Sequence, residues 1–271
     1  MGVMLMGLAV AATSGMFVAS KRTMQMQGRE IETTQAARSA IDMIVRDLRL
    51  GGACLPVTGD FISLEGINSG EEDEITTRTG LTRPDLSCIR STIPTNAATL
   101  ATPIAANATA IPVENSEGFS AGMRAYIRHP DGEGEYFTIS AVQSATQISK
   151  GAAWTRDYPA TSGIYAIDER RFFIQWWTSP RGLQPELRIQ IGSNSPTSFA
   201  VGIEKLNIQY ELRDNCPDCT VMNIPSTNAE WAVVEKVKLS ITARSELPDE
   251  DGKYYRRTVS VDVKPRNLLP Q

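Results

Sequence analysis

Four cysteines are the residues of this chain best suited to chemistry. Cys216 and Cys219 form a Cys-Pro-Asp-Cys pair, whereas Cys54 and Cys88 stand alone. A pair at this spacing can be a redox-active dithiol, half of a zinc site or a small disulfide. Zinc would need Cys54 and Cys88 as its other two ligands. Because the apolar N-terminus indicates export to a compartment where disulfides persist, we favour two bridges, Cys54 to Cys88 and Cys216 to Cys219.

Other candidate ligands and catalytic groups are sparse. The single histidine, His129, is followed by Pro-Asp-Gly, which is typical of a turn. Two acidic runs, 71–74 and 249–251, carry the oxygen ligands that calcium prefers, but neither fits an EF-hand loop. We interpret both runs as solvated turns. The sequence therefore predicts no catalytic, cofactor-binding or metal-binding residue, and no enzyme.

The amino-acid composition bears on the size of the hydrophobic core and on nucleic-acid binding. The 271 residues are 41% hydrophobic and 21% charged, which is enough to bury one sizeable core or two smaller ones. Lys and Arg number 27 against 31 Asp and Glu, so the net charge is -4. With this acidic balance and no long basic run, we predict no direct nucleic-acid binding.

The N-terminus has the composition of a membrane segment. Met1 to Ser20 contain no charged residue, and Lys21 and Arg22 follow directly. About 20 apolar residues suffice for a spanning helix. A cleaved signal peptide would carry its positive charges before the apolar run, so we favour an anchor over a signal peptide. We expect Leu5, Leu8, Val10 and Phe17 to pack in a membrane or filament.

The same helix is predicted to continue to the Gly51-Gly52 pair. No proline precedes Pro56, and the glycines supply a C-terminal stop. Four apolar residues near its end fall on one face at three-and-four spacing, namely Ile41, Ile44, Val45 and Leu48. We expect these four to dock the helix on a folded head.

After Pro56 the pattern changes to short alternating runs, which predict antiparallel strands with one wet face. Strands are expected at 74–81, 171–177, 186–191, 206–212, 237–243 and 259–263. Residues 97–167 begin with an Ala/Thr-rich stretch and continue in short strands, which indicates an insert. We predict a helix over 1–52, an antiparallel head from 53–96 and 168–271, and a β-rich insert subdomain over 97–167. The insert is either a compact decoration or a module that binds a partner or ligand.

Both ends of the chain resemble a known family. Residues 37–53 (ARSAIDMIVRDLRLGGA), residues 233–246 (VVEKVKLSITARSE) and residues 254–268 (YYRRTVSVDVKPRNL) are similar to minor pilins of type IV pili, specifically the PilW type. Members of that family begin with a basic leader, a Gly-Phe processing site and a glutamate. None of these occurs here, and we expect Met1-Gly2-Val3-Met4 to correspond to a position inside the mature helix of a relative.

The resemblance implies an α+β, pilin-like fold, with a long N-terminal α-helix packed on an antiparallel β-sheet head with a β-rich insert. It implies a structural subunit that helps to initiate or cap a pilus, together with other minor and major pilins and the assembly machinery. It places the helix in the bacterial inner membrane and the head in the periplasm, then on the pilus at the cell surface. Two alternatives remain open, a J-type minor pseudopilin of type II secretion and a membrane-anchored periplasmic binding or adhesive module.

Overall fold

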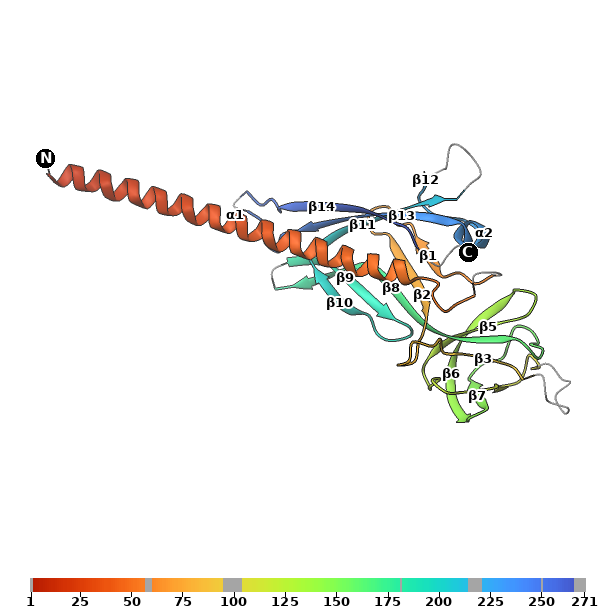
Figure 1. Ribbon diagram of the computed structural model, residues 1–271. Helices are drawn as coiled ribbons and strands as arrows, with labels where there is room; N and C mark the ends of the chain where they lie inside the picture. Colours follow the sequence, from red (N-terminus) through yellow and green to blue (C-terminus); the bar gives the residue numbers. More distant parts are fainter. Residues whose placement is uncertain are drawn as a thin grey trace.

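A computed structural model describes residues 2–56, 60–94, 104–180, 182–213, 221–249 and 251–265, and in them all side chains except those of 2–14, 18 and 229. One long helix, α1 (Gly2–Leu50), projects from a β-rich head, and a short helix, α2 (Asn228–Ala232), lies on the opposite side of that head (Figure 1). No stretch of helix in the described part of the chain is long and apolar enough to cross a membrane.

Every named strand pairing is antiparallel, and the strands form two sheets. The ten-stranded sheet contains β1 (Leu64–Ile67), β2 (Glu74–Gly80), β3 (Arg90–Thr92), β4 (Ala110–Pro112), β5 (Arg124–Arg128), β6 (Gly134–Ser144), β7 (Gln147–Lys150), β8 (Gly163–Ser179), β9 (Gly182–Ile191) and β10 (Thr197–Val201). The four-stranded sheet has the order β12 (Val221–Met222), β11 (Ile203–Leu212), β13 (Val234–Arg244) and β14 (Arg256–Val263).

The predicted α+β, pilin-like fold is wrong. The described chain is mostly β and is organised in two antiparallel sheets, where one sheet bearing an insert was expected. The physical reason is strand β8, which spans 17 residues. Its first part pairs with β3 and β5, and its second part pairs with β2 and β9. The segment interpreted as an insert therefore shares a continuous sheet with the rest of the head.

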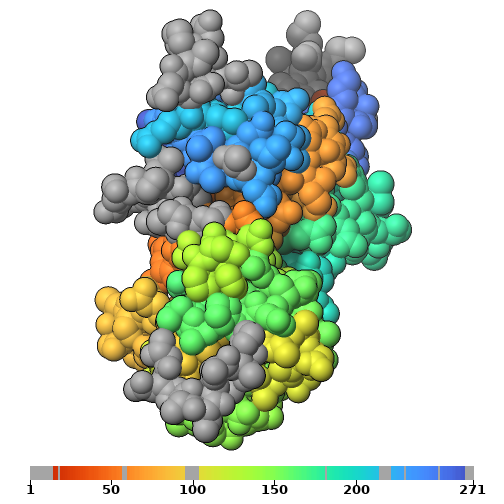
Figure 2. All heavy atoms as spheres, turned by 90° about the vertical axis from the view of Figure 1, so that its right-hand side faces the viewer, coloured from red at the N-terminus to blue at the C-terminus, as the bar shows by residue number. Residues whose placement is uncertain are grey.

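Two large hydrophobic cores divide the described part of the head into two lobes, and a third, smaller cluster is formed by Leu55, Phe61, Tyr126 and Ile167. The first lobe is built from α1, β1, β2, the second part of β8, β9 and the four-stranded sheet. The second lobe is built around β3 to β7 and the first part of β8, and its core includes Ile89 and Ile93, which precede residue 97. Figure 2 shows the lobes from the end of the head, with the blue four-stranded sheet above and the green second lobe below.

A buried arginine on β2 lies where β8 passes from one lobe to the other, and its guanidinium is 4.9 Å from the centre of the Tyr136 ring on β6 of the second lobe. Arg78 of β2 is only 8% exposed, and its Nε donates to Oε2 of Glu169 at 2.6 Å. Its other nitrogens donate to Glu65 at 2.6 Å and to the Ile62 carbonyl at 3.0 Å. A charge buried this deeply is tolerated only when its hydrogen-bonding groups are satisfied, so these contacts fix the geometry of the junction.

Candidate assembly surface on the projecting helix

Helix α1 has a docked part and a free part. From Thr33 onward one side of the helix is buried, and it packs against β13, β14 and the edge strand β10. Ile41, Ile44, Val45 and Leu48, the residues expected to dock the helix, are at most 7% exposed and belong to the first core. Burying a side chain of this size stabilises a fold by about 1.5–3 kcal/mol. Four such contacts are enough to hold the helix firmly.

A buried ion pair orients the docked part. Asp47 is 5% exposed, and both of its carboxylate oxygens accept from Arg170 Nη1 of β8 at 3.3 Å. Arg170 Nη2 also lies 2.8 Å from Asp168. Burial raises the pKa of Asp47 above its ordinary value of 3.8, because the lost solvation outweighs the attraction of Arg170. The pair therefore fixes helix orientation at some electrostatic cost.

That raised pKa gives a pH prediction. Stability linked to a raised carboxyl pKa is fully present below the unfolded value of 3.8 and is lost as pH rises through the folded pKa. Lowering the pH from neutrality should therefore raise the Tm of the wild-type chain relative to Asp47→Asn, in which the proton cannot be exchanged. The Tm of both proteins is measured from neutral pH down to pH 3.8. The difference between the two Tm values cancels the contributions of the other titratable groups, because both proteins carry them. A wild-type chain that loses stability relative to the variant would contradict the assignment.

The helix ends in a tight turn that carries a covalent link. Gly52 adopts a φ of 79°, a left-handed conformation that favours glycine, and its N–H donates to the Arg78 carbonyl at 2.8 Å. Cys54 then bonds to Cys88, with 5.5 Å between their Cα atoms. Gly80 permits the approach, because a Cβ there would lie 2.6 Å from the Cβ of Cys54. The expected bridge is thus present, whereas Cys216 and Cys219 lie outside the described residues.

The free part of α1 carries an exposed apolar stripe. Phe17, Met24 and Ile31 are spaced by seven residues and are 72%, 71% and 57% exposed. Positions seven apart drift by only about 20° around a helix, so the three side chains lie along one line, which we call the helix stripe. At about 100° per residue, Ile31 and the docked Ile44 lie about 140° apart around α1. The helix stripe therefore faces away from the chain's own head.

Of the four residues predicted to pack in a membrane or filament, only Phe17 has a side chain that the structure describes. Phe17 is exposed and belongs to the helix stripe, while the side chains of Leu5, Leu8 and Val10 are outside the described set. Met24 and Ile31 were not predicted as packing residues. The seven-residue interval from Phe17 to Met24 and from Met24 to Ile31 was a usable signal, but the polar residues between these positions hide it in the sequence.

The candidate ligand residues do not converge. In the acidic run at 71–74, Glu71 pairs with Lys205, Glu72 accepts from Trp176 Nε1 at 2.6 Å, and Glu74 pairs with Arg171. His129 lies in a turn closed by the hydrogen bond from Gly132 N–H to its carbonyl. Among residues the structure describes, no three His, Cys, Asp or Glu side chains gather as metal ligands would.

Comparison with known proteins does not assign this chain to a family. No protein-family model matches the chain, and no curated protein is significantly similar to it. The docked and free parts of α1 are therefore the observations on which a function must rest.

Proposed function

We propose that this protein is a structural subunit of a filament, acting as a minor pilin of a type IV pilus, and that it joins neighbouring subunits through the helix stripe. One observation carries the proposal. The free part of α1 exposes Phe17, Met24 and Ile31 on the side opposite its docked face. Large apolar side chains repeated along a helix are costly in water and are matched by the apolar face of another helix.

The geometry suits assembly because the two faces of α1 do not compete. Residues 2–32 extend for about 45 Å at 1.5 Å per residue, which is long enough to contact several neighbouring helices. Docking of Ile44 and Leu48 leaves the helix stripe open, so partner helices can pack there without displacing the head. The resemblance of residues 37–53, 233–246 and 254–268 to minor pilins supports the same class of partner.

Charge placed on the helix stripe should prevent assembly. We expect the double variant Phe17→Glu/Met24→Glu to reduce recovery of the chain in sheared surface filaments by at least about tenfold, because each buried apolar contact is worth about 1.5–3 kcal/mol. The matched control is Gln25→Glu/Gln27→Glu, which adds the same charge at exposed polar positions of the same helix, beside Met24. Filament recovery is measured by immunoblot in cells that make the whole assembly.

Photo-crosslinking identifies the partner. A photoreactive phenylalanine analogue at position 17 or 24 should crosslink to the helices of other subunits, and the same analogue at 27 should do so less. Both double variants should keep the melting temperature of the head, because all four positions lie outside its cores. Equal filament recovery for the two double variants, or no crosslink from position 17 or 24, would rule out the helix stripe as an assembly surface.

A further inference from the structure

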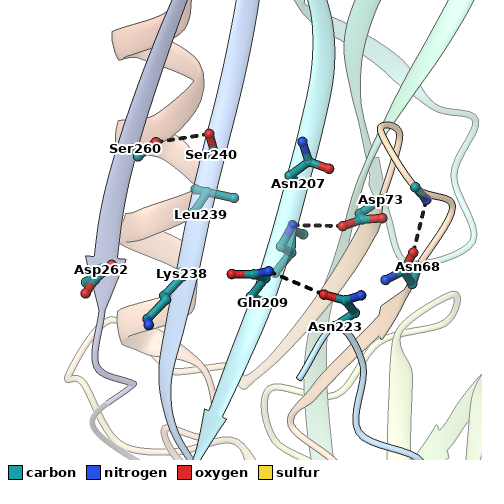
Figure 3. Close-up of a pocket in the computed structure, with 12 residues that line it drawn as sticks. Asn68, Asp73, Asn207, Gln209, Asn223, Lys238, Leu239, Ser240, Ser260 and Asp262 are labelled. Carbon is teal, nitrogen blue, oxygen red and sulfur yellow. Dashed lines mark hydrogen bonds between the residues drawn. The ribbon is translucent and has the colours of Figure 1, made fainter. Parts of the chain in front are cut away.

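A polar groove lies on the four-stranded sheet, on the face opposite α1 (Figure 3). Its volume is about 470 Å3, and it is bounded by β11, β13 and β14 on one side and by the 68–73 loop on the other. Protein sites for small ligands commonly enclose about 300–1,000 Å3. Neither α1 nor the second lobe lines this groove. It is therefore open in the folded chain and is separate from the helix stripe.

Strand register arranges the floor of the groove in two rows of polar side chains. Ser260, Ser240 and Asn207 are consecutive cross-strand partners, and the two serine hydroxyls are hydrogen bonded at 3.0 Å. The second row runs Asp262, Lys238 and Gln209. Gln209 Nε2 extends this row by donating to Asn223 Oδ1 at 3.4 Å. The floor thus presents hydroxyl and amide groups at the regular spacing of a sheet.

The other wall is held in place by a buried carboxylate. Asp73 is 3% exposed and accepts from the Ile208 N–H at 2.8 Å and from the Ser69 N–H at 3.0 Å. These bonds fasten the loop to the edge of β11. Asn68 lies on the same wall, where its Oδ1 accepts from the Gly70 N–H at 3.0 Å. The groove is therefore a preformed feature of the fold, which lowers the entropic cost of binding.

Its lining carries two aspartates and one lysine, and it has unused hydrogen-bonding capacity. Lys238 faces Asp262 across the strands and lies 3.6 Å from Glu211, so its charge is balanced. Within the described residues the Asn207 side chain makes no hydrogen bond, and the Asn68 amide nitrogen makes none either. An amide offers two donors and an acceptor, which suits a ligand that itself both donates and accepts.

Chemistry and position select the ligand class. An anion would meet two aspartates and only one lysine. An added peptide strand would pair at a sheet edge, whereas this groove lies on a sheet face, and the apolar lining residues Ile208 and Leu239 are buried in the first core. We propose that the groove binds a neutral, polyhydroxylated ligand, namely an oligosaccharide, through Asn207, Gln209 and Asn223.

Neutral trisaccharides test this proposal directly. The full chain is prepared in a zwitterionic detergent whose headgroup is not a sugar, and maltotriose, cellotriose, chitotriose and mannotriose are titrated by isothermal calorimetry. We expect at least one to bind with a Kd below about 1 mM. The variant Asn207→Ala/Gln209→Ala should weaken that affinity at least about fivefold, because it removes the polar contacts of two side chains.

Thr242→Ala is the matched control. Thr242 lies on the same strand as Ser240 and bonds to Thr258 at 2.8 Å, but it does not line the groove. This variant should bind the trisaccharide as the wild type does, and both variants should melt at the wild-type temperature. If none of the four trisaccharides binds below about 1 mM, or if Asn207→Ala/Gln209→Ala binds unchanged, the groove is not a saccharide site. The result is independent of filament assembly.

Discussion

Ile44→Asp is expected to lower the free energy of unfolding of the first lobe by about 4 kcal/mol or more. Ile44 is fully buried on α1 and contributes to the first core together with residues of both sheets. The substitution removes a large apolar side chain and places a carboxylate in the first core. Part of the cost appears as a raised pKa, because the buried acid is more stable when protonated. Chemical denaturation followed by tryptophan fluorescence measures the loss.

Ser39→Asp provides the comparison for that result. It adds the same side chain five residues earlier on the same helix, at an exposed position. Surface substitutions of this kind usually change stability by no more than about 0.5 kcal/mol. If the two variants melt alike, α1 is not docked through Ile44. If Ile44→Asp removes only the unfolding transition of the first lobe, the two lobes unfold separately.

Removing the Cys54–Cys88 bridge is expected to cost about 3–4 kcal/mol of stability. The bridge spans 34 residues in sequence, and closing a loop of this length restricts the unfolded chain by roughly that free energy. The double variant Cys54→Ser/Cys88→Ser should therefore unfold at a clearly lower denaturant concentration. The folded lobes should keep their structure, because their cores do not depend on either sulfur atom.

Reducing the wild-type chain distinguishes the effect of losing the disulfide on stability from any effect of the serine side chains themselves. The reduced wild type should match the double variant, and a reductant should change the stability of the variant little. A difference below about 1 kcal/mol between oxidised and reduced wild type would mean that the unfolded state is already restricted in this segment.

Local patterns in the sequence predicted several elements well. The three-and-four spacing of Ile41, Ile44 and Leu48 marked the buried face of α1, because a helical period is visible within a few turns. Alternation likewise marked β11 and β13, in which inward Leu206 and Leu239 are buried. These signals depend only on neighbouring residues.

The arrangement of the strands depends on distant residues and could not be obtained in this way. Thr76 pairs with Arg171, and Arg124 pairs with Ile167, so β8 belongs to both lobes. Nothing local distinguishes such a shared strand from two separate ones, and the predicted boundary at 97–167 followed composition instead. The groove was missed for the same reason, since the 68–73 loop and β11 meet only through long-range bonds such as that from Ile208 to Asp73.

The position of the Cys54–Cys88 disulfide also determines which segments of the protein would bear a force applied along α1. Residues Gly51 to Cys54 connect the end of α1 to the disulfide. If α1 were pulled off the head, these four residues would extend by at most about 14 Å before the disulfide carried the force. Tension then passes through sulfur to Cys88, at the border of the second lobe, and the 33 residues between the two cysteines carry none of it. Strands β1 and β2 lie within this bypassed segment, so these two strands are spared the load, which enters their ten-stranded sheet at β3 instead.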